Sequence, residues 1–233
     1  MTETYLKILA AIAPAIVLAI IMIRKDKRPE PIGWLCAAVG LGVLAGPAVL
    51  LLSYLGWPDF NTDSFVGAVM ESFISAAVPE EMFKLAALSF LVKRCKHFDE
   101  MFDGIVYAVC IGMGFAGLEN ILYVCGDENW IMISISRALM SVPMHYFFAI
   151  IMGTFFSLAW FDMKNRKVYM SAALLLPIII HGVYDTLCFS MGLNENFSSY
   201  FLIAFIIGFK YIRRYVKSLT NSMFKLDGYD IAK

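Results

Sequence analysis

The chain has 233 residues, of which 60% are hydrophobic and 16% charged, and its nineteen basic residues balance its nineteen acidic ones. Its mean hydropathy of +0.72 is far too high for a water-soluble domain of this length. The composition therefore excludes a soluble enzyme and predicts a protein whose solvent is the lipid bilayer. We expect no nucleic-acid partner.

Seven stretches are long and apolar enough to cross a bilayer, because a spanning helix needs about 20 mostly apolar residues. In chain order they are 5–23, 32–56, 65–92, 104–125, 130–161, 168–190 and 199–217. Only short loops separate them, so the sequence predicts one all-α domain over residues 1–233, a polytopic bundle of transmembrane helices. Pro143 lies in the fifth stretch, and the count rises from seven to eight if the helix splits there.

Lys and Arg are distributed unevenly between the loops. Sixteen of the nineteen lie in four segments, which are the loop after the first stretch, residues 93–100, residues 162–167 and the tail from Lys210 onward. The alternate turns contain none: 57–64, 126–129 and 191–198. Because cytoplasmic loops carry the excess of Lys and Arg, the pattern predicts a multi-pass protein of the cytoplasmic membrane, with its N-terminus outside and its C-terminus in the cytoplasm.

Ionisable side chains fall inside these spans, where an ionised group at mid-helix costs roughly 2.5–3.5 kcal/mol even on lenient scales. They are Glu71, Glu80, Glu81, Lys84, Glu119, Arg137, His145, His181 and Asp185. At about 1.5 Å per residue, the two paired glutamates, Glu119 and the two histidines lie about 18–25 Å from the cytoplasmic ends of four different helices. We therefore expect one shared polar cavity in the middle to outer half of a hydrocarbon core about 30 Å thick.

The charges in this cavity do not balance. Four deep carboxylates (Glu80, Glu81, Glu119 and Asp185) face only two cations (Lys84 and Arg137), which leaves a formal charge of minus two. A low-dielectric cavity cannot leave such a charge uncompensated. Either some carboxyl groups are protonated or a divalent cation completes the site.

The residue types also suit a catalytic metal. Glu119, His145 and His181 would form a two-His, one-Glu set with an open fourth position, which is the pattern of catalytic zinc. Glu80 or Glu81 would then take the proton from the attacking water. The sequence does not distinguish between these two glutamates.

Supporting roles follow from helical spacing. Lys84 lies four residues after Glu80, and Asp185 lies four residues after His181, so each pair can interact directly. Arg137 is expected to be a counter-charge for the carboxylates. Small residues recur every four positions, at Gly104, Ala108, Gly112 and Ala116, and predict a stripe along which a neighbouring helix packs closely.

A series of motifs between about residues 70 and 190 resembles the PrsW family. The motifs are Glu80-Glu81-x-x-Lys84, Phe102-Asp103-Gly104, Gly112-x-Gly114-Phe115-Ala116-x-x-Glu119-Asn120, His145, and His181-Gly182-x-Tyr184-Asp185. The resemblance implies an intramembrane protease, distantly similar to the type II CAAX prenyl endopeptidases. It implies a single-span membrane protein as substrate, specifically an anti-sigma factor that is cut on its extracytoplasmic side.

The resemblance also assigns roles. Glu80 and Glu81 match the paired glutamates of these families, and His145 and His181 match the two later histidine motifs. Asp185 takes the position of a terminal Asn or Asp, and Asn120 and Tyr184 belong to the same motifs. Glu119 stands where the CAAX-type relatives carry a histidine, so the two mechanisms need not be identical.

Three alternatives remain open at this point. The protease could work without metal, with a glutamate and a histidine activating water and with His181 and Asp185 stabilising the oxyanion. The same buried groups would also serve a transporter or proton relay, although the sequence shows no paired repeats with interrupted helices. An inactive relative that acts as a scaffold is the third.

Overall fold

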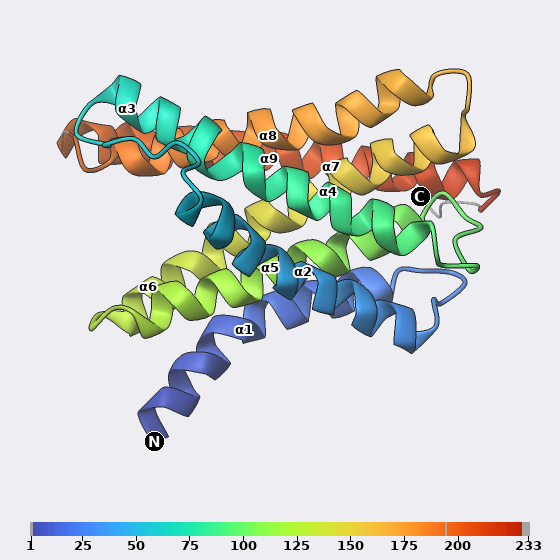
Figure 1. Ribbon diagram of the computed structural model, residues 1–233, viewed down its shortest axis with the longest axis horizontal. Coiled ribbons are helices and arrows are strands. Elements are labelled where there is room, and N and C mark those ends of the chain that lie inside the picture. The colour runs from blue at the N-terminus through green and yellow to red at the C-terminus, as the bar shows by residue number, and fades with distance from the viewer. Residues whose placement is uncertain (1, 194, 230–233) are drawn as a thin grey trace.

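The computed structural model describes residues 2–193 and 195–229, and every regular element in that part of the chain is a helix. The helices lie roughly along one long axis, which is horizontal in Figure 1. They are α1 (Thr2–Ile23), α2 (Ile32–Tyr54), α3 (Phe65–Met70), a π-helical turn η1 (Glu71–Ala77), α4 (Val78–Val92), α5 (Asp103–Cys125), α6 (Trp130–Leu139), α7 (Ser141–Phe161), α8 (Arg166–Ser190) and α9 (Glu195–Leu226). The predicted all-α class is confirmed for the described residues.

Five helical segments in the described residues are long and apolar enough to cross a membrane. They are Thr2–Ile23, Ile32–Tyr54, Asp103–Cys125, Trp130–Phe161 and Arg166–Ser190. The other two predicted spans are helical as well. The run α3–η1–α4 covers 65–92 without a gap, and α9 covers 199–217 and continues to Leu226.

The sequence allowed a break at Pro143, and the structure has one at Met140. Met140 has a φ of −120° and a ψ of −69°, and it separates α6 from α7. A proline ring clashes with the carbonyl four residues earlier, which here belongs to Leu139, the last residue of α6. The break removes that clash and leaves Pro143 in the first turn of α7, where a missing N–H breaks no helical bond. Because α6 has ten residues and is only about 15 Å long, it cannot cross alone, and it counts with α7 as one segment.

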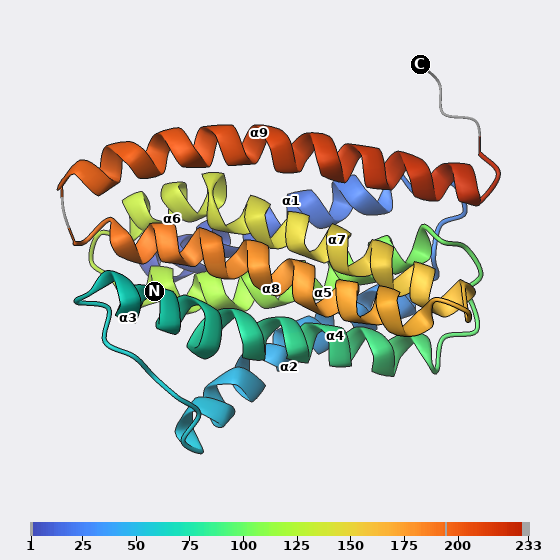
Figure 2. The same cartoon turned by 90° about the horizontal axis from the view of Figure 1, so that it is seen from above.

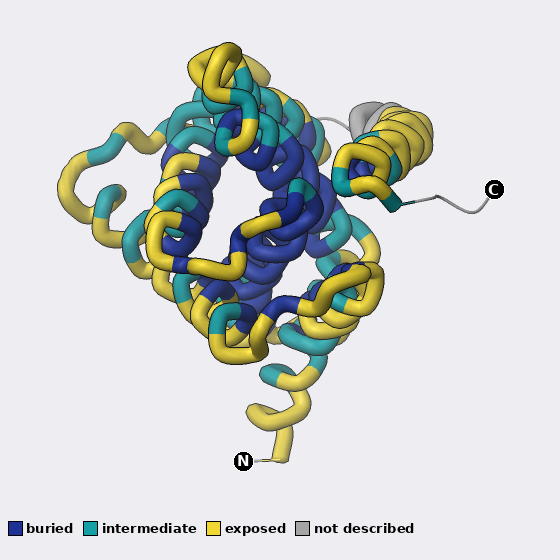
Figure 3. Tube along the Cα trace, turned by 90° about the vertical axis from the view of Figure 1, so that its right-hand side faces the viewer, coloured by how far each residue is buried: buried dark blue, intermediate teal, exposed yellow. Residues whose placement is uncertain are grey.

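Helices α5 and α7 form the centre of the bundle, and small residues bring them together. A Cβ on Gly153 would meet the backbone of Gly104 and Ile105, and a Cβ on Gly112 would lie 2.8 Å from that of Ala149. The predicted small-residue stripe therefore packs against α7, as the fourfold spacing indicated. The view along the bundle in Figure 3 shows the buried segments gathered inside the ring of helices. Leu and Ile side chains on the outer faces of α1 and α2 are exposed, as a lipid solvent allows.

The basic segments lie together. The α1–α2 loop, the α4–α5 loop, the α7–α8 loop and the C-terminal segment all occupy one end of the bundle, at the right of Figure 1, which we call the basic end. The N-terminus lies at the opposite end. Figure 2 shows α9 along one edge of the bundle, beside the other helices. Lys233, which belongs to the basic tail, lies outside the described residues.

Candidate active site

The paired glutamates follow the π-helical turn η1. Pro79 has no N–H, so it cannot donate to the carbonyls of the preceding turn. The carbonyl of Ile74, five residues earlier, instead accepts a hydrogen bond from Trp57 Nε1 at 2.7 Å. π-helical turns occur frequently at functional sites, because the extra residue per turn changes the direction of the side chains that follow. Here those side chains are Glu80 and Glu81.

Helix α8 packs against this turn. A Cβ on Gly182 would lie only 2.6 Å from the ring of Phe73, so the glycine permits the close approach. The neighbouring residue, His181, is thereby placed beside Glu81. The motif glycine therefore has a steric role, because it allows α8 to approach η1 closely.

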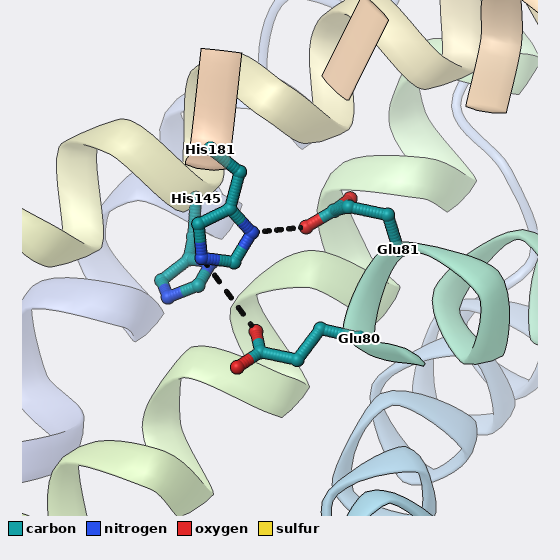
Figure 4. A group of neighbouring side chains, drawn as sticks. All are labelled: Glu80, Glu81, His145 and His181. Atoms are coloured by element: carbon teal, nitrogen blue, oxygen red, sulfur yellow. Dashed lines mark hydrogen bonds and ion pairs between the residues drawn. The ribbon is translucent and has the colours of Figure 1, made fainter. Parts of the chain in front are cut away.

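Four buried side chains converge here, from α4, α7 and α8, and Figure 4 shows them: Glu80, Glu81, His145 and His181. Each offers one ligand atom, and these four atoms all lie within 4.8 Å of one another. Glu81 is fully buried, and the other three are at most 8% exposed. Side chains that we expected to share one polar site therefore lie close together.

Lys84 lies in the middle of this cluster. Its Nζ donates to Glu80 Oε2 at 3.2 Å and to Glu81 Oε1 at 2.9 Å. The same atom lies 3.3 Å from His145 Nδ1 and 4.0 Å from the centroid of the Phe115 ring. The predicted pairing of Lys84 with Glu80 is therefore part of a larger set of contacts that joins α4 to α7.

These contacts determine which nitrogen of His145 carries the proton. An ammonium group only donates, so Nδ1 must accept the hydrogen bond from Lys84. The other nitrogen, Nε2, then donates to Glu119 Oε2 at 3.0 Å. Glu119 is thus bonded to the ring nitrogen that Lys84 does not contact, and it is not one of the four residues whose ligand atoms converge.

Glu119 is also paired with a cation. Arg137 Nη2 donates to Glu119 Oε2 at 2.6 Å, and its Nε donates to Asn120 Oδ1 at 2.6 Å. Asn120 Nδ2 in turn donates to the carbonyl of Ala11 on α1 at 3.0 Å. Arg137 is therefore a counter-charge, as expected, and Asn120 connects it to a further helix.

His181 lies between carboxylates. Its Nδ1 is 2.9 Å from Glu81 Oε1, and its Nε2 is 3.1 Å from Asp185 Oδ2 and 3.9 Å from Glu80 Oε2. Ionised carboxylates only accept hydrogen bonds. If these carboxylates are all ionised, the ring must donate from both nitrogens or exchange one of these contacts for a bond to a metal.

The structure adds two residues that the sequence did not single out. The Phe148 ring stacks on the His181 ring, with centroids 4.8 Å apart and an angle of 23° between the planes. Ser141 Oγ lies 3.1 Å from the hydroxyl of Tyr184. Phe148 lies three residues after His145 and so shares its helix face, which is the signal that could have identified it.

The donor set suits a divalent metal. Two carboxylates and two imidazoles are the ligand types that zinc prefers. Glu81 Oε2 is buried and has no hydrogen-bond donor among the described residues, so one potential ligand atom is left without a partner. A bound cation would also offset the excess negative charge of the carboxylates. It would replace some of the contacts that Lys84 now makes with the same atoms.

Known proteins give the context for this site. Residues 30–211 match the family model described as PrsW family intramembrane metalloprotease. A protein named Protease PrsW from Geobacillus kaustophilus is 35% identical over 84% of this chain and 85% of its own length. The proteins of the same name from Oceanobacillus iheyensis and Bacillus subtilis are 36% and 34% identical, over 83% and 76% of this chain and 85% and 79% of their own lengths. No solved structure matches the chain.

Proposed function

The chain belongs to the PrsW family of intramembrane proteases, and from this membership we propose that it is a zinc-dependent peptidase that cuts a membrane-anchored anti-sigma factor on its extracytoplasmic side. The observation that carries the metal-dependent part is the convergence of four ligand atoms from Glu80, Glu81, His145 and His181 within 4.8 Å of one another in a buried site. The substrate would be a single-span protein of the cytoplasmic membrane.

His145 and His181 would hold the zinc together with a carboxylate. The sequence assigns that carboxylate to Glu119, whereas the convergence of donor atoms favours Glu80 or Glu81 over Glu119. In the second arrangement Glu119 would orient His145 by accepting the proton of its Nε2, as carboxylates commonly do behind a zinc-bound histidine. When bound, zinc supplies a Lewis acid that polarises a carbonyl and acidifies a nearby water.

Glu80 is the better candidate for the general base. A base must reach the water that attacks the substrate, and Glu80 is 8% exposed whereas Glu81 is fully buried. Glu81 also has two short contacts of 2.9 Å, to Lys84 and to His181, whereas Glu80 has one hydrogen bond of 3.2 Å. Glu80 would take a proton from the water as the water oxygen adds to the scissile carbonyl. It would then give that proton to the leaving amine.

The depth of the cluster supports an extracytoplasmic cut. Asp103, at the basic end, and Glu119 are sixteen residues apart on α5, which is about 24 Å of helix. Because Glu119 lies 3.0 Å from His145, the cluster also lies in the half of the bundle away from the basic end. A cavity of about 610 Å³ between α6 and α8 is lined by Met132, Arg137 and Tyr184, among others. It offers a substrate segment a path from the lipid to the residues that contact the cluster.

The decisive experiment combines metal analysis with a cleavage assay. The full chain is purified in detergent, its zinc content is measured, and cleavage of a tagged anti-sigma factor is followed before chelation, after chelation and after zinc is added back. We expect about one zinc per chain, loss of cleavage on chelation and recovery with zinc. Glu71→Gln is the matched control, because Glu71 lies on the same helical run but bonds to the backbone of Phe60 and not to the cluster.

The position of Lys84 favours one competing mechanism. An ammonium group among the four ligand residues already neutralises part of their charge. In that mechanism Glu80 and a histidine activate water without metal. Full activity in zinc-free protein would establish it and exclude the zinc-dependent mechanism. A transporter or scaffold would show no cleavage in any of these samples.

A further inference from the structure

A second cluster of acidic residues lies at the basic end, far from the active site. It consists of Asp26 in the α1–α2 loop, Glu100 in the α4–α5 loop and Asp103 at the start of α5. Each offers one oxygen, and the three oxygens lie within 4.8 Å of one another. Asp26 and Glu100 are 8% exposed and Asp103 is 1% exposed. Three segments of the chain thus bring carboxylates together in a buried place.

In each of these carboxylates one oxygen is held by hydrogen bonds. Asp26 Oδ1 accepts from the backbone N–H of Arg28 at 3.0 Å. Asp103 Oδ2 accepts from two backbone N–H groups, those of residues 99 and 100, at 3.0 and 2.8 Å. Glu100 Oε1 accepts from Arg28 Nη1 at 3.0 Å and from the hydroxyl of Tyr229 at 2.7 Å. The side chains are therefore fixed in orientation.

The second oxygen of each carboxylate has no such partner. Asp26 Oδ2, Glu100 Oε2 and Asp103 Oδ1 are buried, and no donor among the described residues reaches them. Buried oxygens that lack a donor are uncommon in folded proteins, and each costs about 1–3 kcal/mol or more when charged. Three such oxygens in one cluster are available to a bound cation.

Nearby charges do not balance the cluster. Among the described residues, Arg28 is the cation that bonds to the cluster, and its side chain is 62% exposed and therefore largely solvated. A fourth carboxylate, Glu30, lies close enough to Asp103 to interact with it and accepts a hydrogen bond from Tyr107.

We propose that Asp26, Glu100 and Asp103 bind one hard divalent cation, Ca²⁺ or Mg²⁺, through one oxygen of each side chain. Both ions prefer oxygen ligands, and carboxylates are their usual protein ligands. Two oxygens on opposite sides of Ca²⁺ are about 4.6–5.2 Å apart, so three within 4.8 Å of one another fit around one ion. The absence of nitrogen and sulfur donors among these three side chains distinguishes the site from the proposed zinc site, with its two imidazoles.

The cation would join the loops at this end. It would connect the α1–α2 loop to the α4–α5 loop and to the first turn of α5. The C-terminal segment meets the same loop, because Asp227 accepts from the N–H groups of Met101 and Phe102 at 2.6 and 2.9 Å. The site is therefore a structural one that stabilises the basic end, on the helix that also carries Glu119.

The first test needs no variant. The full chain, purified in detergent and freed of metal with a chelator, is titrated with Tb³⁺, an oxygen-seeking mimic of Ca²⁺, and emission excited through the nearby tyrosines is recorded. Tyr229 bonds directly to Glu100, so a bound ion would be sensitised. We expect saturable emission that either Ca²⁺ or Mg²⁺ displaces, and the lower displacing concentration identifies the preferred ion. If the emission does not saturate, or neither ion displaces Tb³⁺, the proposal is wrong.

Variants then test which side chains bind the ion. Asp26→Asn and Glu100→Gln keep the shape of the side chain but remove a charged ligand, so each should weaken binding about tenfold or more. Asp99→Asn is the matched control, because Asp99 lies in the same loop with its side chain 58% exposed and is not part of the cluster. His181→Ala, which disables the proposed zinc site, should leave binding unchanged. Wild-type affinity in Asp26→Asn and Glu100→Gln, or loss of binding in His181→Ala, would overturn the assignment.

Discussion

The Nε2 atom of His145 lies 3.0 Å from Glu119 Oε2, while the Nδ1 atom of the same ring lies 3.3 Å from Lys84 Nζ. The ring is thus held between a carboxylate on α5 and an ammonium group on α4. Glu119 fixes the proton on Nε2 and leaves Nδ1 as the basic nitrogen, on the side where Lys84 and the paired glutamates lie. This arrangement decides what each substitution around His145 should do.

The Glu119→Gln variant tests whether Glu119 binds the metal or only orients His145. If Glu119 only orients His145, the amide oxygen still accepts from Nε2, and zinc affinity should fall about 10–100-fold while one zinc still binds at saturation. If Glu119 is a ligand, zinc binding should be lost, or zinc affinity should fall by much more than 100-fold. Zinc titration of the purified variant measures the difference, and Glu128→Gln in the exposed turn before α6 is the control. We expect the smaller loss.

The two glutamates should respond differently to amidation. Glu80→Gln should lower the cleavage rate by a factor of about 10²–10⁴, the usual contribution of a general base, while zinc still binds. Glu81→Gln should lower zinc content as well, because its carboxylate bonds to both Lys84 and His181. Parallel measurements of cleavage and zinc content test this. Equal zinc loss in both variants would contradict the division of roles.

Spacing within single helices was predictable from the sequence. Residues four apart share a helix face whatever surrounds them, so the pairs Glu80–Lys84 and His181–Asp185 form. Their nitrogen–oxygen distances are 3.2 and 3.1 Å. The common depth of the site was predictable for the same reason, since the helical rise is fixed. The small-residue stripe that begins at Gly104 likewise follows from periodicity alone.

Contacts between helices were not predictable in the same way. Helix rotation decides which nitrogen of His145 faces Lys84. The stacking of Phe148 on His181 depends in the same way on rotation and on the close approach that Gly182 allows. The break lies at Met140 because the Pro143 ring would clash with the preceding helix. The apolar character of the whole span does not show where that break falls. In the acidic cluster at the basic end, Asp26 and Glu100 lie in loops, whose paths periodicity does not describe.

Lys84→Met should destabilise the fold as well as the site. The methionine keeps the length of the side chain but removes the positive charge that lies between two buried carboxylates. Breaking a buried ion pair by removing one partner costs about 3–5 kcal/mol, so the temperature of unfolding in detergent should fall markedly. Lys93→Met, at an exposed position just after α4, is the control. The loss should shrink when zinc is added, because the metal replaces the missing charge, and an unchanged loss would argue against a metal in this cluster.

Gly153→Ala should separate α5 from α7. The new Cβ would meet the carbonyl oxygen of Gly104 and would lie 2.7 Å from the Cα of Ile105, and backbone atoms cannot move aside as a side chain can. The two central helices must therefore shift apart, and overpacking of this kind costs about 1–3 kcal/mol. Because His145 and Glu119 lie on these same two helices, cleavage should fall together with the temperature of unfolding.

Gly208→Ala is the matched control for that variant. Gly208 lies within α9, and a Cβ there would meet nothing within 4 Å. Without a clash, alanine is the better helix former by about 0.8–1.0 kcal/mol, so Gly208→Ala should leave the unfolding temperature unchanged or raise it. The same chemical change thus has opposite signs at two positions, because at Gly153 the neighbouring backbone occupies the space that a methyl group needs. If Gly153→Ala were as stable as Gly208→Ala, the close packing of α5 on α7 would not hold in the membrane.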